Sequence, residues 1–255
     1  MTESPAPLIL RDTFVVRANE TDARGVLAAP ALCNYLQEIA GVHACALGIG
    51  IDTLRGQGVT WMMSGLHLVF DRQAAWRERL TVDTWPSGCR GRLLATRDFL
   101  VHDADGRRVL AGVSEWLMVE HATLKITRLP GSLSDMVPAD TPRAPVPEAA
   151  KIHEPDNPPW AARFAVRRAD IDLNRHANNV HYVEWLLEAL PDTFADRMLA
   201  RLDISYRAGA VRGDVIIAEA APLGGDCVLH RIRREADGAL LTLARTAWTP
   251  AAPAP

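Results

Sequence analysis

The sequence predicts an α+β protein built twice over, with an antiparallel sheet wrapped around one long helix in each half. Three observations support this fold class. Phe14–Ala40 aligns with Phe164–Leu190 without a gap and shares six identical residues with it. Each half has one stretch of helical periodicity followed by several strand-like runs. The tripeptide Ala-Asp-Gly recurs at Ala104–Gly106 and Ala236–Gly238, before the last run of each half.

The first half begins with an alternating run at Phe14–Arg17, which predicts a strand, and a polar turn follows it. Pro30 is compatible with the first turn of a helix, apolar residues then recur at helical spacing, and Gly48 marks the end. Asp103–Gly106 predicts a hairpin between the last two strands of this half. The strand-like runs after the helix are Thr60–Phe70, Arg79–Trp85, Leu93–Val101 and Val109–Val119.

The second half follows a segment in which eight of the thirty residues from Pro130 to Pro159 are proline. This density excludes helix and central strand and predicts an extended linker on the surface. A strand at Phe164–Arg167 and a helix capped by Asn178 or Asn179 come next. Further strands are predicted at Leu202–Arg207, Asp214–Ala220, Val228–Arg234 and Leu240–Trp248. The predicted domains are therefore residues 1–130 and 161–255, joined by a linker over residues 131–160.

Composition limits the classes of function. The chain has 255 residues, of which 48% are hydrophobic, enough for a substantial core. The net charge of −3 argues against a nucleic-acid partner. Two arginine clusters indicate either solvated strand faces or a docking surface for an acidic carrier protein. The first cluster is Arg90, Arg92 and Arg97, and the second is Arg231, Arg233 and Arg234.

The four cysteines lack the spacing of a zinc site and are expected to be reduced packing residues, as in a cytoplasmic protein. We expect no metal and no cofactor. Met1–Leu10 has the features of neither a signal peptide nor an obvious transit sequence. No stretch approaches the length of a membrane span.

Several motifs carry a resemblance to the acyl-acyl carrier protein thioesterases. The run ADIDLNRHANNVHYVEWLLEALP at Ala169–Pro191 resembles a signature of that family, and Asn34–Gly48 and Thr96–Pro130 resemble further segments in the same order. The resemblance implies two tandem hotdog domains, each a sheet curled around a central helix. It implies an enzyme of fatty acid biosynthesis that hydrolyses fatty acyl-acyl carrier protein thioesters and releases free fatty acid. Acyl carrier protein, or CoA, would carry the substrate, with no membrane partner, and the protein could form a homodimer.

One departure from the family changes the expected mechanism. Some members carry Glu-Cys after a Tyr-Arg-Arg sequence in a late strand. Here Tyr206-Arg207 is followed by Ala208–Ala210. A cysteine nucleophile is therefore not available at that position.

The candidate catalytic residues are Asp172, Asn174 and His176. Thioester hydrolysis needs an activated water or an attacking carboxylate, together with donors for the developing oxyanion. In an extended segment these alternating side chains would share one face, and the following helix would offer free N–H groups. His176 or Asp172 would act as general base while the other orients it, and Asn174 would hold the water or the substrate.

The first half has Arg24 and Val26 where the second has Asn174 and His176, so its site is degenerate and it is expected to bind the acyl chain. Trp61–Met63 would line that pocket or pack in the core. Asp22 could form a second carboxylate site.

Other residues of the two helices are expected to be structural. Glu38 and His43 would make packing or interdomain hydrogen bonds, and Asn178, Asn179 and Tyr182 would build the start of the second helix.

Three other functions remain open. An acyl-CoA thioesterase would use the same residues. A hydratase or dehydratase of acyl thioesters commonly has a longer spacing between Asp and His than this chain has. A non-catalytic acyl-binding protein would bind thioesters without turnover.

Overall fold

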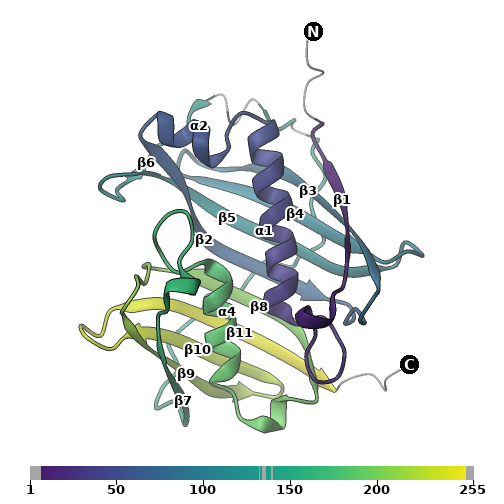
Figure 1. The fold of residues 1–255 in the computed structure, drawn as a ribbon, viewed down its shortest axis with the longest axis vertical. Coiled ribbons are helices and arrows are strands. Elements are labelled where there is room, and N and C mark those ends of the chain that lie inside the picture. The colour runs from purple at the N-terminus through teal and green to yellow at the C-terminus, as the bar shows by residue number, and fades with distance from the viewer. Residues whose placement is uncertain (1–6, 132, 134–135, 139, 251–255) are drawn as a thin grey trace. The chain divides into compact units, whose positions relative to one another are not determined.

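The computed structural model describes residues 7–131, 133, 136–138 and 140–250. The chain divides into two compact units (Figure 1). Unit 1 comprises residues 1–28, 32–64 and 74–146, and unit 2 comprises residues 29–31, 65–73 and 147–255. The end of one strand from the first half of the sequence, residues 65–73, thus belongs to unit 2.

Unit 1 contains an antiparallel sheet with the strand order β1-β3-β4-β5-β2. Its strands are β1 (Leu10–Val15), β2 (Val59–Phe70), β3 (Arg79–Arg90), β4 (Leu94–His102) and β5 (Arg108–Glu120). The four strands predicted after the helix are therefore confirmed, whereas the first, predicted at Phe14–Arg17, lies earlier in the chain and overlaps β1 only at Phe14 and Val15. Strand β3 continues five residues beyond the predicted end because its register with β4 shifts between Pro86 and Gly88, which accommodates the proline. The short elements α2 (Ile51–Gly56) and β6 (Ile126–Thr127) were not predicted.

Helix α1 (Ala29–Ala46) packs one apolar face inward and confirms the predicted first helix. Pro30 lies in its first turn, and Gly48 follows its last residues with a φ of 73°. The buried face follows helical spacing and consists of Leu32, Cys33, Tyr35, Leu36, Ile39, Ala40 and His43. Burying each large apolar side chain contributes roughly 1.5–3 kcal/mol to the driving force for folding.

Unit 2 repeats this plan. Its strand order begins with Gly65–Val69 at the end of β2, which pairs with β8, and continues through β11, β10 and β9 to β7. The strands are β7 (Trp160–Ala165), β8 (Arg197–Tyr206), β9 (Val215–Gly224), β10 (Cys227–Arg234) and β11 (Leu240–Pro250). Helix α4 (Asn179–Glu188) packs against β7, β9 and β10, and a short 3₁₀ helix, η3 (Asp192–Phe194), follows it. An antiparallel sheet with a helix against it is consistent with the predicted hotdog fold (Figure 1).

The two halves of the chain begin with the same series of elements at a constant offset. Strands β1 and β7, the 3₁₀ helices η1 (Ala18–Glu20) and η2 (Arg168–Asp170), and the first residues of α1 and α4 are each 150 positions apart. Phe14 stacks on Tyr35 at 4.5 Å between ring centroids, and their counterparts Phe164 and Trp185 also stack, at 6.5 Å. The gap-free alignment of the two halves therefore corresponds to equivalent elements.

The linker differs from its prediction in two ways. Gly131 and Leu133 are helical, so the exclusion of helix was wrong at the start of the segment, where prolines are sparse. Residues 142–159 have no regular secondary structure, as expected. However, Ala144 is buried rather than on the surface, and its N–H donates to Asp98 Oδ2 at 2.7 Å.

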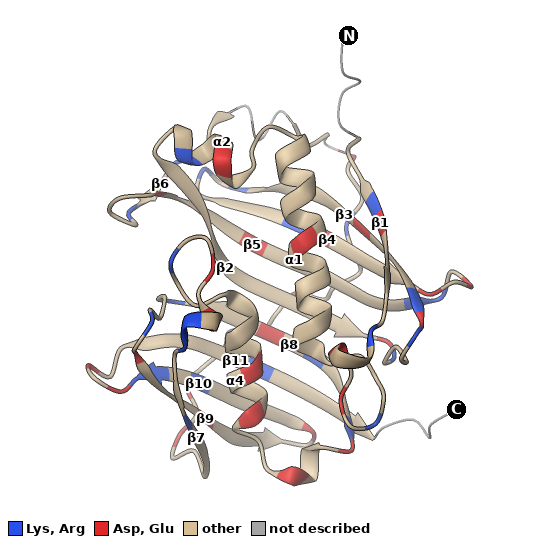
Figure 2. Ribbon diagram, in the orientation of Figure 1, with Lys and Arg blue, Asp and Glu red and all other residues tan. Residues whose placement is uncertain are grey.

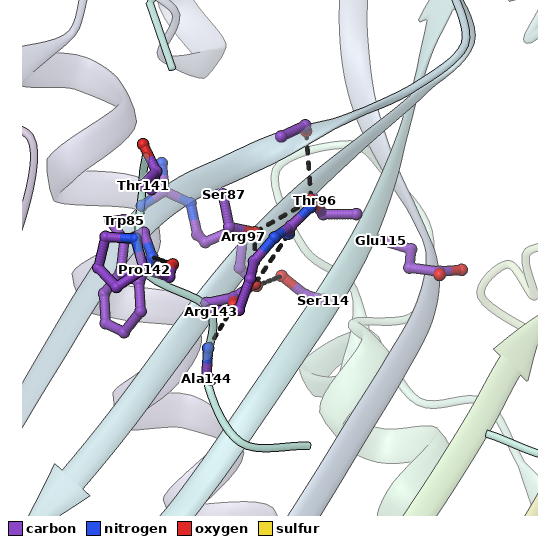
Figure 3. Close-up of polar contacts among 12 residues, drawn as sticks. Trp85, Ser87, Thr96, Arg97, Ser114, Glu115, Thr141, Pro142, Arg143 and Ala144 are labelled. Carbon is purple, nitrogen blue, oxygen red and sulfur yellow. Dashed lines mark hydrogen bonds and ion pairs between the residues drawn. The ribbon is translucent and has the colours of Figure 1, made fainter. Parts of the chain in front are cut away.

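Polar contacts fix this part of the linker within unit 1 (Figure 3). Trp85 Nε1 donates to the carbonyl oxygen of Pro142 at 2.8 Å, and Arg143 Nη1 donates to Thr96 Oγ1 at 3.1 Å. Ala144 also packs with Trp85 and Ala111 in a small apolar cluster. The segment is thus ordered by side chains of β3 and β4 despite lacking secondary structure of its own.

Two expectations about the whole chain concern cysteines and membranes. All four cysteines are free, and burial raises the pKa of the Cys33 thiol to about 12, which keeps it protonated and inert. Within the described part of the chain, no helix is long and apolar enough to cross a membrane.

Candidate active site

Asp172, Asn174 and His176 lie together in one tight turn between η2 and α4. The turn is closed by an antiparallel bridge between Ile171 and Ala177. Within it, Asp172 N donates to the carbonyl oxygen of His176 at 2.9 Å. The three predicted residues are thus brought close together by the local backbone.

The expectation that this segment is extended was wrong. Asp172 Oδ1 accepts the N–H of Asn174 at 2.7 Å, and the Asp172 carbonyl accepts the N–H of Arg175 at 3.0 Å. Arg175 has a φ of 63°, in the left-handed region. An aspartate that hydrogen-bonds the backbone two residues ahead favours a turn over an extended strand, and this local preference prevails here.

His176 is oriented by its own turn. Its Nδ1 lies 2.9 Å from the carbonyl oxygen of Asn174. Because a carbonyl oxygen can only accept, the proton of the neutral ring belongs on Nδ1, and Nε2 keeps its lone pair. The side chain is partly exposed. His176 can therefore accept a proton at Nε2 from a molecule outside the protein.

Gly209 lies directly against the His176 ring. A Cβ atom on Gly209 would lie 2.6 Å from Cδ2 and 3.2 Å from Cγ of the imidazole. Carbon atoms do not approach so closely, so only glycine leaves room for the ring in this position. Gly209 lies in the Ala208–Ala210 segment that follows Tyr206-Arg207. The sequence showed that the cysteine is missing but not that the glycine contacts His176.

Four hydrogen bonds hold the segment around Gly209 in place. Ala177 N donates to the Ala210 carbonyl at 2.8 Å, and Ala210 N donates to the hydroxyl oxygen of Tyr182 at 2.7 Å. Arg234 donates to the Gly209 carbonyl at 2.9 Å and to Asp214 Oδ2 at 3.1 Å. Burial raises the pKa of Tyr182 to about 12, so its hydroxyl stays neutral. These contacts fix the surface on which the His176 ring rests.

A second group of ionisable residues flanks the turn on both sides in the sequence, and the sequence analysis did not identify it. Asp170 is buried and accepts hydrogen bonds from the backbone and side chain of Arg167. Burial alone would raise the pKa of Asp170, but the bonds from Arg167 outweigh it and lower the pKa. His181 Nδ1 lies 2.7 Å from Glu184 Oε2, and this hydrogen bond raises the pKa of His181. Neither Asp170 nor His181 contacts His176 in these hydrogen bonds, so we assign both a supporting role.

The start of α4 is built as expected from the sequence. Asn178 Oδ1 accepts the N–H of Val180 at 3.0 Å, and the Asn178 carbonyl accepts the N–H of His181 at 3.0 Å. Tyr206 donates its hydroxyl hydrogen to the Asn179 carbonyl at 3.2 Å. The backbone N–H of Asn179 has no acceptor among the described residues. Of the N–H groups at this helix start, that of Asn179 can therefore bind an external oxygen.

The equivalent turn in the first half holds a closed ion pair. Arg24 Nη2 lies 2.7 Å from Asp22 Oδ2, and Arg24 N donates to Asp22 Oδ1 at 2.9 Å. Val26, at the position of His176, bridges to Ala75. This turn therefore has no histidine, and its carboxylate is engaged by Arg24.

His43 forms a structural hydrogen-bond network in unit 1. It is fully buried, its Nε2 lies 2.9 Å from the Pro7 carbonyl, and its Nδ1 lies 3.0 Å from Arg97 Nη1. Burial lowers the pKa of His43, which keeps the ring neutral, so Nε2 donates and Nδ1 accepts. The expectation of a packing hydrogen bond rather than a catalytic role for His43 agrees with this geometry.

Most arginines of the two predicted clusters are paired or buried. Arg90 pairs with Glu115 and Arg97 is buried, whereas Arg92 is exposed and has no side-chain partner among the described residues. Arg231, Arg233 and Arg234 pair with nearby carboxylates, which are Glu154, Glu219, Asp214 and Asp237. Within the part of the chain that the structure describes, no three His, Cys, Asp or Glu side chains are grouped as a metal site.

Comparison with protein families gives two matches, in the same order as the two halves. The model of the acyl-ACP thioesterase N-terminal domain matches residues 7–137, and that of the acyl-ACP thioesterase C-terminal domain matches residues 153–250. The chain therefore belongs to the acyl-ACP thioesterase family.

Individual relatives agree with this assignment. The chain is 28% identical to the oleoyl-acyl carrier protein thioesterase of Coriandrum sativum over 84% of this chain and 63% of the relative. It is 25% identical to an Arabidopsis thaliana oleoyl-acyl carrier protein thioesterase over 94% of this chain and 76% of the relative. Both relatives are chloroplastic by name. The chain thus spans less than two thirds of the coriander protein.

Solved structures show the same fold over nearly the whole chain. An acyl-ACP thioesterase from Bacteroides thetaiotaomicron superposes with a TM-score of 0.84 and 26% identity, over 94% of this chain and 98% of that one. The 12:0-ACP thioesterase from Umbellularia californica superposes with a TM-score of 0.86, over 96% of this chain and 98% of that one. Its 24% identity supports the fold alone.

Proposed function

We propose that the protein hydrolyses fatty acyl-acyl carrier protein thioesters, releasing a free fatty acid and the carrier thiol. Membership of the acyl-ACP thioesterase family and the names of its relatives support the reaction and the substrate class. The observation that carries the proposal is His176. Its Nδ1 is fixed by the Asn174 carbonyl at 2.9 Å, and its ring lies on Gly209, so Nε2 is a positioned base.

In the proposed reaction, Nε2 of His176 takes a proton from a water molecule as the water oxygen attacks the thioester carbon. The carbonyl π electrons move to oxygen and give a tetrahedral oxyanion. When this intermediate collapses, the carbon–sulfur bond breaks, and the sulfur leaves with the proton that His176 held. The products are the carboxylic acid and the thiol, and the imidazole returns to its neutral form.

The turn geometry supports different roles for Asp172 and His176. The Asp172 carboxylate holds the Asn174 N–H and so shapes the turn, while the Asn174 carbonyl orients the imidazole. We therefore assign His176 as the base and Asp172 as a positioning residue. The Asn174 side chain would hold the water or the substrate.

The oxyanion needs a hydrogen-bond donor close to His176. We assign this role to the N–H of Asn179, which lies three residues after His176 at the start of α4 and has no acceptor among the described residues. A positioned donor of this kind contributes roughly 3–4 kcal/mol to transition-state stabilisation in hydrolases.

We further propose two tandem hotdog domains over residues 1–130 and 161–255, joined by the linker at 131–160. The equivalent starts of the two units support this arrangement. The first domain would hold the acyl chain, since its turn carries Val26 and the Asp22–Arg24 ion pair in place of a base. The four free cysteines support a reducing compartment such as the cytoplasm.

The test is a panel of acyl-acyl carrier protein and acyl-CoA thioesters, with the free thiol and the fatty acid measured separately. We expect equimolar thiol and fatty acid, faster from the carrier protein. Hydration of an enoyl thioester without release of thiol would instead indicate a hydratase. Binding of the thioesters without any product would indicate an acyl-binding protein.

A further inference from the structure

Four arginines close to the His176 turn are exposed and have no ion pair or side-chain hydrogen bond among the described residues. Arg168 lies in η2 and Arg175 precedes His176 in the turn. Arg207 and Arg212 flank Gly209, which lies against the His176 ring. Since each residue spans at most about 3.6 Å, all four backbone positions lie near the catalytic turn.

Three carboxylates close to these arginines in the sequence are already engaged. Asp170 is bound by Arg167, and Asp214 is bound by Arg234. Asp172 accepts the N–H of Asn174 within the turn. The positive charge of the four arginines is therefore not cancelled by ion pairs within unit 2, and Figure 2 shows the charged residues of this region.

The first half of the chain has no arginine at the positions equivalent to these four. At the offset of the two turns, Ala18 and Gly25 stand in place of Arg168 and Arg175. In the first half Leu27 N donates to the Ala74 carbonyl, and in the second half Ala177 N donates to the Ala210 carbonyl. These equivalent hydrogen bonds align the segment around Ala74 with the segment around Ala210. In that alignment Asp71 and Trp76 replace Arg207 and Arg212. The unpaired arginines thus accompany only the turn that has a histidine.

Exposed apolar side chains lie among these arginines. Leu173, at the tip of the turn, is 72% exposed, and Val211, beside Arg212, is 42% exposed. An isolated exposed leucine needs no explanation, but exposed apolar groups framed by unpaired charge are typical of a surface that binds a protein.

We propose that Arg168, Arg175, Arg207 and Arg212, with Leu173 and Val211, form a docking surface for an acidic carrier protein. This inference rests on the proposed function and specifies how its substrate is recognised. CoA would need only a compact phosphate site, whereas these arginines come from three separate chain segments and surround apolar groups. A protein with an acidic face and a thioester on a flexible arm fits that breadth and charge.

The experiment compares the triple variant Arg168→Glu/Arg207→Glu/Arg212→Glu with the triple variant Arg79→Glu/Arg92→Glu/Arg128→Glu. The control arginines are also exposed and without side-chain partners among the described residues, and the two variants change the net charge equally. Arg175 stays unchanged because it adjoins His176. Each protein is assayed with the same acyl group on acyl carrier protein, on CoA and on the neutral thiol N-acetylcysteamine.

We expect the docking variant to lose about 10-fold or more in kcat/KM for the carrier protein at low salt, chiefly through KM. Because salt screens charges over about 10 Å at 0.1 M, the difference should shrink as salt is added. Hydrolysis of the neutral thioester should stay within about twofold of the unmodified protein, and the control variant should be close to it with every substrate.

Three outcomes would overturn the docking surface. An equal loss with the neutral thioester would place the arginines in the chemistry, and an equal loss with CoA would make them a phosphate site. An equal loss in the control variant would reduce the effect to net charge. If the unmodified protein hydrolyses none of the three thioesters, the proposed function itself fails.

Discussion

The two turns, Thr21–Leu27 and Ile171–Ala177, have almost the same backbone and differ in their side chains. Both are closed by a bridge between their end residues, and the N–H of each aspartate, Asp22 or Asp172, donates to a carbonyl at 2.9 Å. The first turn has a glycine at its left-handed residue and the second has Arg175. The two turns thus share an aspartate and its backbone hydrogen bonds, and only the second has a histidine, the proposed base, at its sixth residue.

The first prediction removes that base. His176→Ala should lower kcat for acyl-acyl carrier protein by about 10²-fold or more, because His176 is the proposed base. Val26→Ala, the same change at the equivalent position of the first turn, should alter kcat by less than about twofold. Circular dichroism checks the fold of both variants. Equal losses in the two variants would show that both turns contribute to catalysis.

The second prediction concerns the contact between Gly209 and His176. Gly209→Ala should lower kcat by roughly 10²-fold with little change in KM, because a Cβ atom 2.6 Å from Cδ2 would displace the ring. Gln73 stands at the equivalent position of the first half, where no histidine has to fit. Gly41→Ala is the matched control, since no atom lies within 4 Å of a Cβ there.

Gly41 lies within α1, so alanine there should stabilise the protein by roughly 0.5–1 kcal/mol without changing kcat. A Gly209→Ala variant with normal kcat would show that the ring position seen here is not needed for turnover. A variant in which KM rises while kcat falls would instead indicate damage to substrate binding.

The third prediction concerns the buried His230, at whose equivalent position the first half has no histidine. His230 pairs with Ala244 in β11, and Phe99 pairs with Gly112 in β5. Phe99 is therefore the counterpart of His230 in the first half. Burial lowers the pKa of His230 from 6.5 to about 3. Between these pH values the unfolded chain is protonated at this residue and the folded protein is not. Stability should therefore fall as the pH is lowered from 6.5 towards 3.

His230→Phe, which copies the first half, should reduce the slope of unfolding free energy against pH by up to about 1.4 kcal/mol per pH unit. Urea midpoints measured between pH 3.5 and 7 test this. The slope due to His43, whose pKa burial also lowers, should remain. An unchanged slope would mean that His230 is protonated in the folded protein over this range.

The smallest expected effect comes from restoring the lost residues. Arg24→Asn with Val26→His should leave turnover within about twofold, and it should not rescue His176→Ala. The first turn would regain a histidine but would still have Gln73 in place of Gly209, and its Ala75 already bridges to residue 26. Recovery of activity in the His176→Ala background would show that the turn alone, without its surroundings, is sufficient.

Much of the secondary structure was predictable because it depends on local periodicity. The buried face of α1 and the alternating strands are written in the spacing of apolar residues, and Asn178 caps α4 as its position predicted. The internal alignment also identified Asp172, Asn174 and His176 as a group. Their geometry was predicted wrongly, because the hydrogen bond from Asn174 N to Asp172 Oδ1 closes a turn that alternation alone does not reveal.

The sequence by itself determined the α+β class, the alignment of the two halves and the family, since these rest on patterns along the chain. Only the tertiary structure decided what surrounds the histidine. Gly209 is thirty-three positions from His176, and its contact exists because the Ala177–Ala210 hydrogen bond joins two distant segments. Likewise, charge composition could not distinguish Arg231 and Arg233, which carboxylates neutralise, from Arg207 and Arg212, because ion pairing depends on distance in space rather than along the chain.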